Sequence, residues 1–137
     1  MLNVLYIAVI ILVLLFLSRV ARGLLPVKGL AFIKEHQFFD QLNSADVQIL
    51  DIRDPNDFEQ EHYPNAINIY LGRLPYLYKK ELDKGNEIVI ISKSKSTIRK
   101  AARILKKAGY ESLSGILWTE LNNSTEEQTK ANISVVS

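Results

Sequence analysis

A short polar loop carries the residues with the clearest chemical potential: Ser92, Lys93, Ser94, Lys95, Ser96 and Thr97. Hydroxyls, ammonium groups and backbone amides together suit the binding of an oxyanion. Ser92 is also a candidate nucleophile, but a serine nucleophile needs an adjacent base. His36 and His62 are distant in sequence and would have to approach it in space. The loop therefore predicts an anion site, a serine nucleophile, or only a solvated surface loop.

The flanking segments predict how this loop is held. Ile88 to Ile91 is an unbroken β-branched run, which is typical of a strand buried on both faces. From Thr97 the apolar residues recur at helical spacing, at Ile98, Ala101, Ala102 and Leu105. Gly109 occupies the position of a left-handed helix cap. The loop would then lie at a helix N-terminus, where the helix dipole favours an anion.

This stretch resembles the active-site segment of the rhodanese-like domains. In that family a strand ends in the cysteine of Cys-Arg-Ser-Gly-x-Arg, and the loop amides cradle a persulfide whose sulfur passes to cyanide or another thiol. The resemblance places Ser92 at the cysteine, Lys93 at the first arginine, Lys95 at the glycine and Thr97 at the second arginine, whereas Ser94 matches. Ala101 and Ala102 match the family's paired alanines. The chain has no cysteine.

A second stretch supports the resemblance. Asp51-Ile52-Arg53 matches the family's Asp-x-Arg, and an acidic and an aromatic residue follow at the family spacing. His62, Pro64 and Ala66 match a later motif, in which Asn65 replaces a glycine but tolerates positive φ. The resemblance implies scaffold roles for four of these residues, with a catalytic base as the alternative for the histidine: Asp51, Arg53, Asp57 and His62.

The order of segments predicts four parts. Residues 1–22 are expected to form a transmembrane anchor, because Leu2 to Leu17 is apolar except for Asn3 and the segment reaches about 20 residues. Residues 23–31 would be a juxtamembrane linker, residues 32–118 the rhodanese-like domain, and residues 119–137 a disordered polar tail. The domain is expected to be α/β, a parallel sheet with helices on both faces.

The positive charges around the apolar segment predict its orientation. Arg19, Arg22 and Lys28 follow the segment, and no lysine or arginine precedes it. The positive-inside rule then predicts an N-terminus outside and a cytoplasmic domain. An uncleaved anchor is favoured over a signal peptide, which begins with a positive region. A buried core helix is the remaining alternative.

Composition narrows the functional classes. With 47% hydrophobic and 23% charged residues, the 137-residue chain is expected to be largely globular, and a net charge of +2 gives no argument for nucleic acid. We expect no metal and no cofactor. Because an oxygen cannot carry a persulfide, the favoured interpretation is a membrane-anchored binding or scaffold module without sulfurtransferase activity. The alternative is a sulfurtransferase working with a partner thiol or unrecognised chemistry.

The partners follow from the same features. As binding partners we expect the lipid bilayer, an unidentified protein and a small oxyanion. The basic segment from Lys93 to Lys107, which includes the predicted helix, has no acidic residue, so it is either a surface for anionic lipid or an ordinary solvated face.

Overall fold

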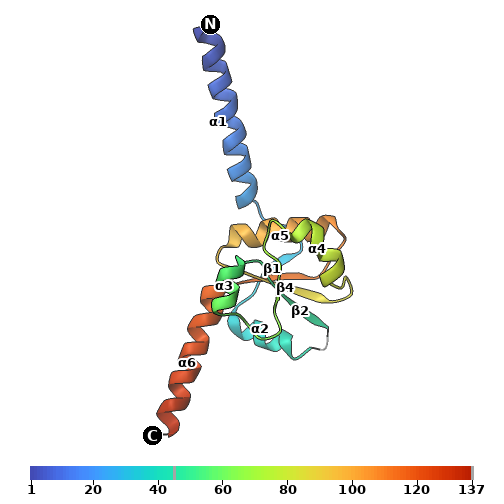
Figure 1. Cartoon of the computed structure of the whole chain (residues 1–137), viewed down its shortest axis with the longest axis vertical. Coiled ribbons are helices and arrows are strands. Elements are labelled where there is room, and N and C mark those ends of the chain that lie inside the picture. Colours follow the sequence, from blue (N-terminus) through green and yellow to red (C-terminus); the bar gives the residue numbers. More distant parts are fainter. Residues whose placement is uncertain (45, 137) are drawn as a thin grey trace.

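The computed structural model describes residues 1–44 and 46–136, and its centre is a fully parallel five-stranded sheet (Figure 1). The strand order is β1-β5-β4-β2-β3. The strands are β1 (Leu30–Phe32), β2 (Val47–Asp51), β3 (Ile67–Asn68), β4 (Glu87–Ser92) and β5 (Leu113–Leu117). The helices are α1 (Leu2–Leu24), α2 (Glu35–Leu42), α3 (Pro55–Gln60), α4 (Leu74–Glu81), α5 (Lys95–Lys107) and α6 (Trp118–Val136).

The central strand β4 divides the core into two layers. Its side chains alternate, so that Ile88 and Ile90 pack with α4 and α5 on one face. Val89 and Ile91 pack with α2 and the first turn of α6 on the other face. All four side chains are fully buried. The predicted α/β fold, with a parallel sheet between helices, is confirmed.

Helix α5 is fixed at its C-terminal end by the predicted glycine cap. Gly109 has φ +93°, a conformation that L side chains rarely adopt. Its amide donates to Lys106 O at 3.0 Å, and the Tyr110 amide donates to Leu105 O at 3.0 Å. This is the Schellman arrangement, and it is accompanied by burial of both Leu105 and Tyr110. Asn65, at φ 63°, likewise has the predicted positive φ.

The close approach of α5 to the sheet depends on a second glycine. A Cβ atom on Gly115 of β5 would lie 2.6 Å from Ile98 Cγ2 of α5. Ile98 is fully buried, so its methyl group has little room to move away. Gly115 therefore sets how near the basic helix packs to β5.

The start of the domain differs from the sequence prediction. The domain was expected to begin at residue 32, but Leu30–Phe32 form β1, which pairs in parallel with β5 at the sheet edge. Helix α2 begins only at Glu35, where the Lys34 amide donates to Gln37 Oε1 at 2.9 Å. The linker is therefore shorter than predicted, because α1 continues to Leu24 and the sheet begins at Leu30.

The predicted disordered tail is also different: residues 118–136 form α6, and Ser137 lies outside the described residues. The base of α6 is held by Leu121, which is buried in the α2 side of the core. Beyond that point, Thr125 Oγ1 donates to Leu121 O at 3.1 Å and Thr129 Oγ1 to Thr125 O at 2.8 Å. No glycine or proline interrupts this segment. The polar composition of this segment therefore gave no indication of a helix whose first turn packs in the core.

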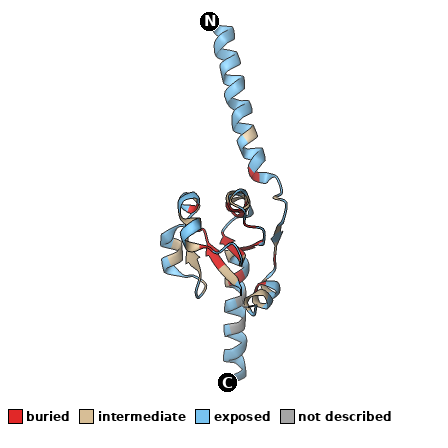
Figure 2. Cartoon of the chain, turned by 90° about the vertical axis from the view of Figure 1, so that its right-hand side faces the viewer, coloured by how far each residue is buried: buried red, intermediate tan, exposed pale blue. Residues whose placement is uncertain are grey.

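Helix α1 projects from the domain on the side opposite to α6 (Figure 1). Figure 2 shows that it is exposed along nearly its whole length, and its apolar window has 0% of its residues buried. Its 23 residues would span about 35 Å, against about 30 Å for the hydrocarbon core of a bilayer. By length and composition alone α1 is able to cross a membrane.

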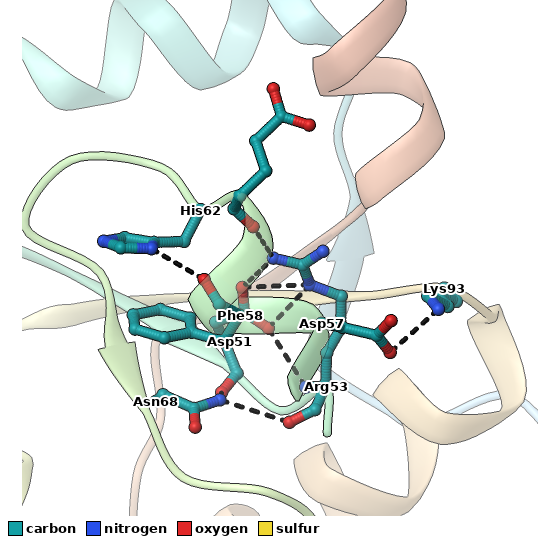
Figure 3. A network of polar contacts seen from close by, with 8 residues as sticks. Asp51, Arg53, Asp57, Phe58, His62, Asn68 and Lys93 are labelled. Carbon is teal, nitrogen blue, oxygen red and sulfur yellow. Dashed lines mark hydrogen bonds and ion pairs between the residues drawn. The ribbon is translucent and has the colours of Figure 1, made fainter. Parts of the chain in front are cut away.

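A buried ion pair closes the carboxyl end of β2 (Figure 3). Asp51 is 0% exposed, and Arg53 is 4% exposed. Arg53 Nη2 donates to Asp51 Oδ2 at 2.8 Å, and Arg53 Nε donates to both carboxylate oxygens at 3.0 Å. The guanidinium also donates to Glu61 O at 2.8 Å. Its carbon lies 3.8 Å from the ring centroid of Trp118.

The ion pair therefore joins three parts of the chain. Arg53 contacts the end of α3 through Glu61 O and the start of α6 through Trp118. The side-chain amide of Asn68, in β3, donates to Asp51 O at 3.0 Å and to Arg53 O at 3.1 Å. Charges buried to this extent are tolerated because they are paired and hydrogen-bonded.

We expect Arg53→Met to destabilise the domain by about 3–5 kcal/mol, because it leaves the Asp51 carboxylate buried without its partner. The free energy of unfolding is measured by urea titration of the full chain in nonionic detergent, followed by circular dichroism. The double variant Asp51→Leu/Arg53→Met removes both charges. We expect its loss of unfolding free energy to be smaller than the sum of the losses in Asp51→Leu and in Arg53→Met.

Lys93→Met is the matched control, because it also removes one cation from an ion pair. That pair, Lys93 with Asp57, is solvent-exposed and is expected to contribute no more than about 1 kcal/mol. An Arg53→Met loss as small as that of the control would contradict the role given to the buried pair.

Candidate functional site

Ser92 is the last residue of β4, at the carboxyl edge of the sheet. It pairs with Leu117 of β5 and is 4% exposed. The carboxyl edge of a parallel sheet is the usual place for a ligand in an open α/β fold. The structure therefore places Ser92, at the family's cysteine position, at this edge, but its side chain is largely covered.

The loop after Ser92 is shorter than predicted. Only Lys93 and Ser94 separate β4 from α5, because Lys95, Ser96 and Thr97 already belong to the helix. Ser94 is the N-cap: its hydroxyl accepts from the Thr97 amide at 3.2 Å and lies 2.7 Å from Thr97 Oγ1. The sequence prediction started the helix at Thr97 because it took this serine as a loop residue rather than as a cap.

This cap changes the expected anion cradle. The first amides of a helix have no acceptor within the helix and are the groups that would bind an oxyanion. In α5 the Thr97 amide is already satisfied by Ser94 Oγ. An incoming anion would have to displace that hydroxyl or use the remaining amides alone.

The two lysines of the predicted cradle have other neighbours. Lys93 Nζ forms an ion pair with Asp57 Oδ2 of α3 at 2.8 Å (Figure 3). Lys95 Nζ lies 5.3 Å from the ring centroid of Phe32, in β1, and the guanidinium carbon of Arg99 lies at the same distance from that ring. The positive charge near the loop is therefore partly neutralised and partly placed over an aromatic ring.

His62 is held by α3. Its Nδ1 lies 2.7 Å from Phe58 O, and its ring stacks on the Phe58 ring with centroids 3.9 Å apart. In Figure 3, His62 and Lys93 lie on opposite sides of the Asp51–Arg53 pair. Within residues 1–44 and 46–136, neither histidine makes a hydrogen bond with Ser92. These contacts favour the structural interpretation of His62 over the catalytic one.

The neighbouring Tyr63 belongs to the core rather than to the loop. Its ring packs against Phe38 with centroids 4.9 Å apart, and burial raises the pKa of its hydroxyl. No proton transfer at neutral pH is expected from it.

Sequence reasoning anticipated the members of the Asp51–Arg53 motif but not two of their partners. Trp118 was predicted only as the last residue of the domain, and nothing in the sequence pattern placed its ring over Arg53. Asn68 had no signal at all, because a polar residue in a two-residue strand has no distinctive spacing.

Comparison with known proteins places this geometry in a family. The family model described as "Rhodanese-like domain" matches residues 35–117. A curated relative, "Putative sulfur carrier protein YrkF" of Bacillus subtilis (strain 168), is 32% identical over 71 residues. That match covers 52% of this chain and 38% of the relative, so the chain spans well under half of the relative's length.

Solved structures show the same fold. The Alr3790 protein from Anabaena sp. superposes with a TM-score of 0.62 at 20% identity, covering 66% of this chain and 85% of that one. The Saccharomyces cerevisiae single-domain sulfurtransferase RDL2 superposes with a TM-score of 0.59 at 17% identity, covering 73% of this chain and 94% of that one. These likenesses concern the fold alone. The family-model match and the Asp51–Arg53 and Ser92 segments together establish that the chain belongs to the rhodanese-like domain family.

Proposed function

We propose that this chain is a membrane-anchored rhodanese-like domain that has lost sulfur transfer and acts as a binding or scaffold module. The observation that carries the proposal is Ser92 at the end of β4, in a chain with no cysteine. Sulfur transfer needs a thiolate that attacks a sulfane sulfur and holds it as a persulfide. A serine hydroxyl is scarcely ionised at neutral pH, and its oxygen cannot form that sulfur–sulfur bond.

The surroundings of Ser92 support loss of catalysis over a new serine chemistry. His62 Nδ1 is engaged with Phe58 O, and among the described residues no histidine hydrogen-bonds Ser92 as a base would. The Ser94 cap and the Lys93–Asp57 ion pair stabilise a closed helix start in place of an open cradle. For the same reasons an oxyanion site at residues 92–97 is a weaker candidate than a scaffold role.

A sulfurtransferase working with a partner thiol is the second candidate. What favours it is the description of the relatives, a sulfur carrier protein and a sulfurtransferase. In that case the thiol of another protein would have to carry the persulfide, because this chain supplies none.

The membrane assignment rests on α1. Its exposed apolar surface has no partner in the domain, and the bilayer is the environment that would cover it. Arg19 and Arg22 follow the apolar run, which supports a cytoplasmic domain.

We expect Ser92→Cys to gain a sulfur atom when the full chain is incubated with thiosulfate. The new thiolate attacks the sulfane sulfur, a sulfur–sulfur bond forms, and sulfite leaves. The α5 N-terminus should lower the pKa of this thiol, whereas burial at this position opposes its ionisation and slows access. Intact-mass spectrometry measures the added sulfur, and sulfite release is measured in parallel.

Ser44→Cys, on an exposed turn far from α5 in sequence, is the matched control. It should show an ordinary thiol with much slower uptake. A folded Ser92→Cys chain that reacts no faster than this control would mean that the strand end no longer activates a thiol.

Because the chain has no cysteine of its own, a single introduced cysteine reports on which side of the membrane it lies. We expect Asn3→Cys to be labelled by a membrane-impermeant maleimide in intact cells and Asn132→Cys only after lysis, because the positive charges retain the domain inside. Labelling of both variants after lysis is the control for reactivity. Labelling of Asn132→Cys in intact cells would refute the orientation.

A further inference from the structure

A groove lies between the last turns of α1 and the basic face of α5. It has a volume of ≈ 410 Å³ and is lined by Arg19, Val20, Arg22, Gly23, Lys100 and Arg103. Four of the six lining residues are cations, and none is acidic. The groove is distinct from the polar contacts around Asp51 and Ser92.

The groove is formed by a specific approach of the two helices. Gly23 is buried, and a Cβ atom there would lie 3.3 Å from Ser96 Oγ and 3.9 Å from Lys100 Cε. Arg103 Nη2 donates to Leu25 O at 2.7 Å, just beyond the end of α1. This glycine and this hydrogen bond hold α1 against α5 and bring the four cations together.

The charge of the groove is not compensated nearby. Helix α1, residues 25–29 and α5 contain no aspartate or glutamate. Among the described residues, none of the four cations has an ion-pair partner. The C-terminal end of α1 contributes only about half a negative charge. The site therefore favours an anion with more than one acceptor oxygen, such as a phosphate group.

The apolar surface beside the groove indicates an amphiphilic ligand. Phe16 and Leu17 lie in the turn of α1 before Arg19, and both are exposed. A phosphate in the groove would thus have apolar helix surface adjacent to it, on which acyl chains could lie. We propose that this groove binds the phosphate headgroup of an anionic phospholipid and so holds the domain against the membrane surface.

This inference rests on the proposed insertion of α1, which places Arg19 and Arg22 at the level of the headgroups. It also has a consequence for the family's site. Because Ser96 of α5 approaches Gly23 of α1, a bound lipid would keep the segment after Ser92 close to the membrane surface. A partner protein that binds the segment after Ser92 would have to approach it along the surface of the bilayer.

The test is lipid binding by the full chain in neutral detergent, measured by native mass spectrometry. Dioctanoyl phosphatidylglycerol is compared with dioctanoyl phosphatidylcholine and with inorganic phosphate as a competitor. We expect the wild type to prefer phosphatidylglycerol. Arg22→Gln/Lys100→Gln should weaken that binding about thirtyfold, corresponding to about 1 kcal/mol for each basic residue. Inorganic phosphate at the same concentration should not displace the lipid.

Lys79→Gln/Lys80→Gln is the matched control, since it removes the same charge from exposed positions on α4. We expect it to bind as the wild type does. Arg22 and Lys100 are exposed, so both double variants should fold, and circular dichroism checks this.

Three results would overturn the proposal. They are equal binding of the two lipids, an equal loss in the control variant, and displacement by inorganic phosphate, which would indicate a free oxyanion site. Alkaline carbonate extraction of membranes containing each variant tests the insertion of α1 separately from the headgroup site. A chain released by carbonate would refute insertion of α1, whereas a retained chain without lipid preference would refute only the headgroup site.

Discussion

The buried pairing of Asp51 with Arg53 is the constraint on which the arrangement of the domain depends. A carboxylate that is 0% exposed needs its guanidinium partner. The buried guanidinium in turn needs hydrogen-bond acceptors and a side chain that packs over its face. Glu61 O and the ring of Trp118 supply them, so the end of α3 and the start of α6 are fixed to the end of β2. The pair thus orients the carboxyl edge of the sheet, where Ser92 also lies. None of these contacts requires a cysteine, which explains how the fold persists in a chain without one.

The residues to which the resemblance gives scaffold roles each make a defined polar contact in the structure: Asp51, Arg53, Asp57 and His62. At the loop, by contrast, serine stands at the cysteine position and a serine cap closes the helix start. Four cations line the groove between α1 and α5, beside the segment that would enter a membrane. The proposed binding surface at the bilayer and the proposed loss of sulfur transfer are consistent with one another.

The sequence predicted those features of the fold that local spacing determines. The apolar run of β4, the helical spacing of α5 and the left-handed Gly109 cap were all anticipated and are confirmed. Features that depend on distant partners were not anticipated. Leu30–Phe32 is a strand only because β5 lies beside it, and α6 is a helix that begins where Leu121 enters the core. At the candidate site, the position of Ser92 was predictable, whereas the role of Ser94 as a cap and the pairing of Lys93 with Asp57 depend on side-chain geometry that spacing does not encode.

The most direct test of the central claim is the thiosulfate-to-cyanide sulfur-transfer rate of the wild-type full chain in neutral detergent. We expect no thiocyanate above a no-protein control, because the chain has no cysteine whose thiolate could hold the sulfane sulfur. An active rhodanese-like protein assayed in the same detergent shows that the conditions support transfer. Turnover by the wild-type chain that rises in proportion to its concentration would contradict the account and make this protein an enzyme with a different sulfur acceptor.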